Sequence, residues 1–252
     1  MSGHSKWATI KHKKAAIDAK RGKIFSRMSK EITIAAKTGG GDMDMNPRLR
    51  TAVLAAKAVN MPADNIDRAI KKGTGELPGV TYEDIMYEAY GPAGAAMMIR
   101  VLTDNRNRIA GEVRATLERR GGSMAGAGAV AWQFNRKGFI TVEKSSASEE
   151  TLFNIVTDAG AEDLQAGAEV YEITTPVEAF ETVKQALEQQ KIATASAELT
   201  MLPASTVKIT DEKDAAAILR LIESVEELDD VQNVYANFDM DEALMQKVSE
   251  QM

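Results

Sequence analysis

The sequence contains no cysteine, and it has only two histidines and two tryptophans among 252 residues. Without thiols the chain has no disulfide framework, no cysteine-bound zinc or iron–sulfur cluster, and no thiol nucleophile. No apolar run approaches the roughly 20 residues that span a membrane, and the N-terminal residues lack the apolar segment of a signal peptide. These absences predict a cytoplasmic chain with no membrane contact, no cofactor and no metal.

Groups suited to catalysis are also scarce. His4 and His12 both lie in an N-terminal lysine run, which makes a weak metal site, and there is no Gly-x-Ser-x-Gly motif. The glycine-rich residues 121–128 fit neither a dinucleotide fingerprint nor a phosphate-binding loop and predict a helix end followed by a strand. The acidic run 226–230 lacks the spacing of a calcium loop and predicts a solvated turn. These observations predict a protein that is not an enzyme. The contrasting hypothesis is an enzyme, which would require ionisable groups that converge between the later domains.

Charge is distributed unevenly along the chain. The formal net charge is −6, but residues 1–75 carry 16 Lys and Arg against 6 Asp and Glu, whereas residues 138–252 carry 7 against 24. Such asymmetry indicates a basic segment that binds polyanions and an acidic remainder that they repel. Two alternatives stay open, a basic face that serves solubility and a basic domain that docks on the acidic one. The acidic region is also a candidate surface for a protein partner.

The basic segment is predicted to be helical, with helices at residues 5–20, 23–37, 47–59 and 63–72 and a linker at 73–79. At 100° per residue, Lys23, Arg27 and Lys30 fall on one face of the second helix. The apolar residues from Phe25 to Ala36 fall on the opposite face. One face is therefore expected to pack on a helical core while the other presents cations to phosphate.

The candidate nucleic-acid-binding residues include most cations of this segment and two arginines near the start of a later helix, predicted from residue 104 to 120. Trp7 either stacks on a base or anchors the tail as an apolar contact. Arginines at a helix N-terminus oppose its dipole, which favours a functional reason for the later pair. The full set is Lys6, Trp7, Lys11, His12, Lys13, Lys14, Lys20, Arg21, Lys23, Arg27, Lys30, Arg106 and Arg108.

Beyond residue 79 short strands alternate with helices. Strands are predicted at 82–90, 96–103, 130–134, 139–143, 163–165, 170–174, 195–202, 206–209 and 231–237, with helices at 148–159, 176–190 and 211–223. Residues 139–202 have the β-α-β-β-α-β order of a ferredoxin-like module. The fold class is α+β: a helical bundle (1–75), a discontinuous α/β domain (76–136 plus 204–252) and a ferredoxin-like domain inserted into it (137–203).

Several motifs in these segments resemble one family from end to end. They begin with Gly3-His4-Ser5-Lys6-Trp7 and Arg21-Gly22-Lys23-Ile24-Phe25. They continue with Asn46-Pro47-Arg48, Met61-Pro62-Ala63-Asp64-Asn65, Tyr90-Gly91-Pro92, Asp104-Asn105-Arg106-Asn107-Arg108 and Asp230-Val231-Gln232-Asn233-Val234. The chain resembles the YebC/PmpR family of probable transcriptional regulators, which is similar to the mitochondrial translational activator of cytochrome oxidase. Ala89 and Ala93 depart from the family, which is richer in glycine at this turn.

The resemblance implies a cytoplasmic, non-catalytic protein with three domains, the third inserted in the second. It implies DNA binding and control of transcription. Relatives linked to ribosomes and to passage through proline-rich stretches imply the alternative, a translation factor that binds ribosomal RNA. A basic stripe binds either polyanion, so the residues leave DNA and RNA both open.

Overall fold

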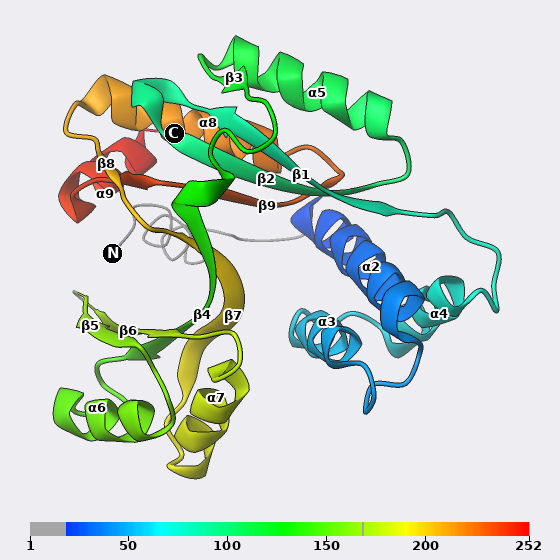
Figure 1. Cartoon of the computed structure of the whole chain (residues 1–252), viewed down its shortest axis with the longest axis horizontal. Coiled ribbons are helices and arrows are strands. Elements are labelled where there is room, and N and C mark those ends of the chain that lie inside the picture. The colour runs from blue at the N-terminus through cyan, green and yellow to red at the C-terminus, as the bar shows by residue number, and fades with distance from the viewer. Residues whose placement is uncertain (1–18, 168, 252) are drawn as a thin grey trace.

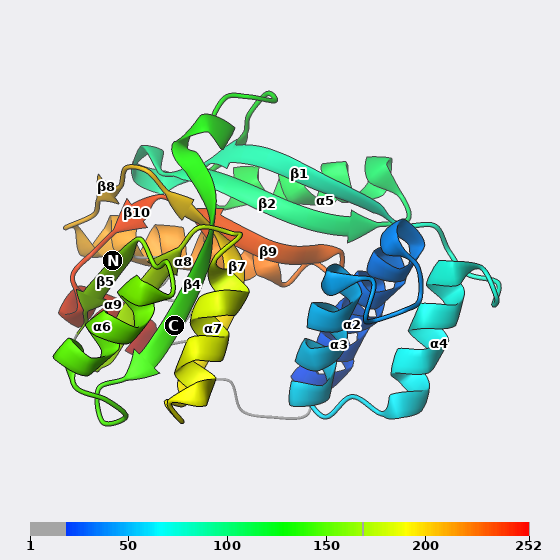
Figure 2. The ribbon, with the colours of Figure 1, turned by 60° about the horizontal axis from the view of Figure 1, so that its bottom comes forward.

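The structure is a computed structural model that describes residues 19–167 and 169–251. Its first part is a bundle of three helices, α2 (Ala19–Gly39), α3 (Pro47–Ala58) and α4 (Ala63–Thr74), which lie side by side in both views (Figures 1 and 2). Their core includes buried Ile32, Leu49 and Ile66. The three helices predicted from residue 23 onward are confirmed, and the helix predicted at 5–20 lies almost wholly outside the described residues.

Two local contacts set the geometry of this bundle. Asn46 caps α3 by accepting a hydrogen bond from the Leu49 amide at 3.0 Å, and its side-chain nitrogen donates to the Ala35 carbonyl of α2 at 2.9 Å. Where α4 crosses α2, a Cβ atom at Gly73 would lie 2.4 Å from the Thr33 carbonyl oxygen. Only glycine therefore allows α2 and α4 to approach this closely.

The next part is an antiparallel sheet covered on one face by helices. Its strands are β1 (Glu83–Tyr90), β2 (Ala96–Thr103), β3 (Ser123–Met124) and β9 (Val231–Ala236), in the order β3-β1-β2-β9. Helices α5 (Arg106–Arg119) and α8 (Glu212–Glu226) lie on the same side of this sheet (Figure 1). Alternate β2 residues, such as Ile99, pack on these helices, whereas Met98 points to the other face.

A second antiparallel sheet follows β3 in the chain. It contains β4 (Phe134–Glu143), β5 (Asp163–Ala166), β6 (Val170–Thr175) and β7 (Thr194–Pro203), in the order β5-β6-β4-β7. Helices α6 (Glu149–Asp158) and α7 (Phe180–Gln189) share its core. This succession and strand order are those of a ferredoxin-like module. Because the chain returns afterwards to place β9 beside β2, the pairing is the one that an inserted module predicts.

Three short elements complete the described chain. Strand β8 (Val207–Lys208) pairs in parallel with β10 (Phe238–Asp239), and helix α9 (Glu242–Glu250) packs against the same core as α8. Helix α9 was not predicted, although Leu244, Met245 and Val248 have helical spacing. A short 3₁₀ turn, η1 (Pro92–Gly94), joins β1 to β2 and places Ala93 at φ +56°. The alanine that departs from the family thus adopts the backbone conformation that favours glycine.

The strand predicted at 130–134 is wrong. Residues 131–133 form a 3₁₀ turn, η2 (Ala131–Gln133), and β4 begins only at Phe134 and continues to Glu143. The cause lies in β1, where the buried carboxylate of Glu88 accepts hydrogen bonds from the amides of Gly128, Val130 and Ala131 at 2.6, 2.6 and 2.9 Å. A partner so distant in sequence overrides the local strand preference of the apolar run.

Candidate nucleic-acid interface

The basic face of α2 lies against the acidic turn between α8 and β9, residues 226–230. Lys23 donates to the Glu227 carbonyl, Arg27 donates to the Glu226 carbonyl, and Lys30 donates to the Asp229 carbonyl at 3.1 Å. The carbonyls of Glu226 and Glu227 end α8, where the helix dipole is negative. The predicted turn is confirmed and its Glu227 and Asp229 are exposed, but the run also receives cations of the same chain. We call this contact the clasp.

Arg27 is partly buried in the clasp. Burial lowers the pKa of its guanidinium, while the nearby carboxylates of Glu226 and Asp229 act to raise it. Its Nε atom is buried and has no hydrogen-bond partner among the described residues. An arginine keeps its charge in such surroundings, so the clasp holds a cation partly removed from water.

The clasp continues through Asp230, whose side chain is only 8% exposed. Lys30 binds its Oδ1 at 2.5 Å, while Arg108 and Thr103 bind its Oδ2 at 2.7 and 2.8 Å. Burial acts to raise the pKa of Asp230, but the hydrogen bonds from Lys30, Arg108 and Thr103 outweigh it and lower the pKa. The carboxylate thus stays charged and joins α2, β2 and α5.

A second ionic group joins the bundle to the sheet. Glu31 of α2 and Asp84 of β1 each bind both Arg48 of α3 and Arg100 of β2, with nitrogen–oxygen distances of 2.7–3.0 Å. Burial acts to raise the pKa of Asp84, but the hydrogen bonds and charges of Arg100 and Arg48 lower it below its usual value. Two acids and two arginines in alternation neutralise one another, so this group is a structural contact between bundle and sheet.

The predicted site residues separate into three sets. Those from Lys6 to Lys14 lie outside the described residues; Lys20 and Arg21 lie in the first turn of α2, and nothing is described of their side chains. Lys23, Arg27, Lys30 and Arg108 are brought together at the clasp. Arg106 is exposed at the first residue of α5, two residues before Arg108. Cations of α2 and an arginine of α5, which are far apart in the sequence, thus meet at one place. There they bind backbone carbonyls and a carboxylate of the same chain.

Other exposed cations of the bundle were missed in the sequence reading. Arg50 and Lys57 of α3 are seven residues apart, and Arg68 and Lys72 of α4 are four apart, so each pair lies on one helix face. The signal was this spacing, which applies to α3 and α4 as much as to α2. Together with Lys37, they give the bundle exposed positive charge away from the clasp.

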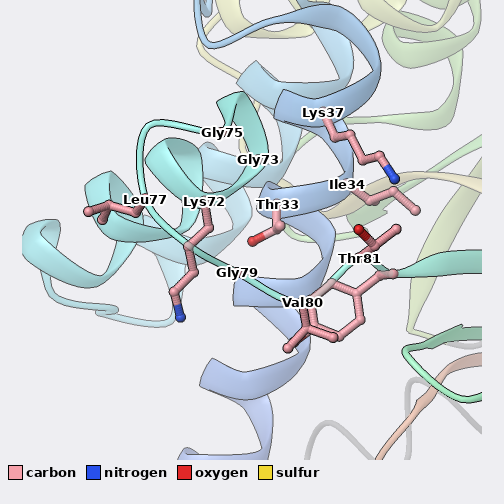
Figure 3. Close-up of a pocket in the computed structure, with 11 residues that line it drawn as sticks. Thr33, Ile34, Lys37, Lys72, Gly73, Gly75, Leu77, Gly79, Val80 and Thr81 are labelled. Atoms are coloured by element: carbon pink, nitrogen blue, oxygen red, sulfur yellow. The ribbon is translucent and has the colours of Figure 1, made fainter.

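A crevice of about 240 Å³ lies between α2, the end of α4 and the linker to β1. Figure 3 shows Lys37 and Lys72 on opposite sides of it, with Thr33 and Val80 between them. The Thr33 hydroxyl donates to the Ala69 carbonyl at 3.1 Å, so its proton is already used within the bundle. The two ammonium groups do not converge, and the lining contains no carboxylate or histidine, so the crevice lacks a catalytic constellation.

Within residues 19–167 and 169–251, no group of three or more His, Asp or Glu is arranged to hold a metal ion. No helix in the same ranges is both long and apolar enough to cross a membrane.

Comparison with known proteins places the whole chain. Residues 5–76 match the family described as "TACO1/YebC protein N-terminal domain", and residues 82–238 match "TACO1/YebC second and third domain". The chain belongs to the TACO1/YebC family. The boundary between the two matches falls in the linker between α4 and β1, where the bundle ends and the first sheet begins.

Individual relatives of this TACO1/YebC chain cover nearly its full length. A protein of Syntrophobacter fumaroxidans is 52% identical over 99% of this chain and 100% of its own, and one of Geobacter sulfurreducens is 54% identical over 98% and 100%. Both are named as probable transcriptional regulatory proteins, and neither name describes an enzyme. The crystal structure of a conserved hypothetical protein from Aquifex aeolicus is 46% identical and has a TM-score of 0.81 over 90% of this chain and 93% of that one. The predicted α+β class is confirmed.

Proposed function

We propose that this protein is a cytoplasmic, non-enzymatic regulator of transcription that binds DNA through its basic N-terminal domain. The observation that carries the proposal is the charge of residues 1–75, which contain 16 Lys and Arg but only 6 Asp and Glu. The names of the relatives support the regulatory role. Each cation that neutralises a phosphate releases condensed counterions, so this segment would dominate the affinity.

The cations fall into two functional classes in this proposal. Lys23, Arg27 and Lys30 hold the bundle to the rest of the molecule through the clasp. The DNA contacts are then assigned to the segment from Lys6 to Arg21 and to exposed cations such as Arg106, Arg50 and Lys57. A phosphate that reached the clasp lysines would have to displace carbonyls and a carboxylate that already satisfy them.

The test compares two charge reversals that change the net charge equally. Lys13→Glu with Lys14→Glu alters the proposed interface, whereas Lys191→Glu with Lys208→Glu alters exposed lysines of the acidic part. In a mobility-shift assay with duplex DNA, the first variant is expected to lose affinity and to reduce the salt slope by about 1.8, since each lost phosphate contact removes about 0.9. The second is expected to bind like the wild type.

Equal loss in both variants would mean that only the overall charge matters, and unchanged affinity in the first would overturn the proposal. The same assay with a ribosomal RNA fragment separates the two polyanions. Tighter binding of the RNA at equal salt would contradict a role at DNA.

A further inference from the structure

Trp132 is the most exposed aromatic side chain within residues 19–167 and 169–251, at 74% of its area. It lies in η2, on the connection from β3 to β4 beside β1 (Figure 1). The residues two positions before and after it are buried, because Val130 is 0% and Phe134 is 6% exposed. The backbone is thus anchored in the core while the largest side chain faces water.

The loop is held in this conformation by the side chain of Glu88. Both carboxylate oxygens of Glu88 accept hydrogen bonds, from the amides of Gly128, Val130 and Ala131. Burial acts to raise the pKa of Glu88, but these backbone hydrogen bonds lower it, so the carboxylate stays ionised and its bonds are charge-assisted. A loop of glycine and alanine is thereby made rigid around one exposed ring.

A second aromatic ring lies beside the first. The indole Nε1 of Trp132 donates to the Ala129 carbonyl at 3.1 Å, and the hydroxyl of Tyr90 donates to the same oxygen at 3.4 Å. Tyr90 is also exposed, at 40%. The indole N–H and the phenol hydroxyl both donate to the Ala129 carbonyl oxygen, and these bonds orient the two rings. Part of each ring surface stays open to a flat ligand.

Two arginines of α5 lie toward the edge of the sheet that carries this loop. Residues 121–133 contain no charged residue, and Glu88 is committed to the loop. Arg114 of α5 reaches this edge of the sheet, with Nη2 3.9 Å from the sulfur of Met124, and Arg120 is exposed at the end of the same helix. Aromatic rings with arginines nearby are the combination that binds unpaired bases of a single strand.

We propose that Trp132 and Tyr90 form a stacking platform for an unpaired base of single-stranded DNA. The inference rests on the proposed function, because it assumes that the chain binds DNA, and it adds a contact at the opposite end of β1 from the clasp. Strand β1 runs from Glu83 to Tyr90 and is about 23 Å long, so the platform lies well away from the clasp.

The two tryptophans of the chain give a direct readout. Trp7→Phe leaves Trp132 as the only tryptophan, and its emission is expected to be quenched when an oligo(dT) strand is added to the full chain. An abasic strand of the same length supplies the phosphates without bases and is expected to leave the emission unchanged. Quenching by oligo(U) alone, quenching by the abasic strand, or no quenching by oligo(dT) would overturn the platform.

Affinity provides an independent measurement. Trp132→Ala is expected to weaken oligo(dT) binding about 5- to 100-fold, which is the range for loss of one stacked base, and Trp132→Phe to weaken it less. Phe153→Ala removes another exposed aromatic ring, on α6, and is expected to stay within about twofold. Equal affinity of Trp132→Ala and the wild type would contradict the inference. If the wild type binds no DNA at all, the proposed function fails together with the platform. If the wild type binds DNA and Trp132→Ala binds it equally well, only the platform fails.

Discussion

Lys30 and Arg108 bind opposite oxygens of one carboxylate, that of Asp230, at 2.5 and 2.7 Å. One cation belongs to the N-terminal bundle and the other to the helix that follows β2. A partly buried acid therefore links two groups of basic residues that both looked like surface contacts for nucleic acid. This relationship assigns them a structural role that can be measured separately from binding.

The first prediction concerns that carboxylate. Asp230→Asn keeps the shape but removes the charge that Lys30 and Arg108 share, and it is expected to lower the free energy of unfolding by about 2 kcal/mol. Asp229→Asn is the matched control, because its side chain is 92% exposed and its loss is expected to stay within about 0.5 kcal/mol. Urea denaturation measures both. Equal stability of the two variants would show that the charge of Asp230 contributes nothing to stability.

The second prediction is a loss of stability in acid. The pKa values of Asp84, Glu88 and Asp230 all lie below their usual values in the folded chain. A depressed pKa stabilises the fold above the unfolded value, near about 4, and this stabilisation is lost as the pH falls through the folded value. Denaturation between about pH 7 and about pH 3 is expected to show little change from these groups above about pH 5 and a decline below about pH 4. A Glu88→Gln, Asp230→Asn double variant should decline less steeply.

The third prediction concerns the rigid loop. Glu88→Gln replaces one acceptor oxygen by an NH₂ group, so the amides of residues 128–131 lose part of their charge-assisted bonding. Unfolding is expected to become easier by about 2 kcal/mol, and the amides of Val130 and Ala131 should exchange hydrogen faster. Glu83→Gln on the same strand alters an exposed acid and should change stability by no more than about 0.5 kcal/mol. Unaltered exchange in Glu88→Gln would mean that packing alone holds the loop.

The fourth prediction is a stabilising substitution. Ala93 has φ +56°, and a left-handed backbone costs an alanine about 1–2 kcal/mol. Ala93→Gly removes this strain but adds chain entropy to the unfolded state, so a net gain of about 0.5–1 kcal/mol is expected. Ala115→Gly, in the exposed interior of α5, makes the same change in a helix and should cost about 1 kcal/mol. Thermal unfolding of both variants tests this, because the midpoint temperature should rise for Ala93→Gly and fall for Ala115→Gly.

Much of the bundle could be predicted from local pattern. The apolar residues placed on one face of α2, including Ile32, Ala35 and Ala36, do lie in its core with Phe25 and Met28 packed against them. Helical periodicity carries this information because it depends only on neighbours along the chain.

What the opposite face contacts could not be read in the same way. The carbonyls that receive Lys23 and Arg27 belong to residues about 200 positions away, and no spacing rule connects them. The same holds for Glu88 and η2, where a distant carboxylate turned an expected strand into a turn. Segregated charge leaves a basic domain docked on the acidic one among the alternatives, but the residues that make the contact are seen only in the fold.

The most direct test of the central claim is crosslinking of the protein to nucleic acid in cells, followed by sequencing of what is bound. Wild type and the Lys191→Glu, Lys208→Glu variant are expected to recover promoter DNA, and the Lys13→Glu, Lys14→Glu variant to lose it. Recovery of ribosomal RNA instead of promoter DNA, or equal recovery of DNA by all three proteins, would contradict a transcriptional regulator that binds through its basic N-terminal domain.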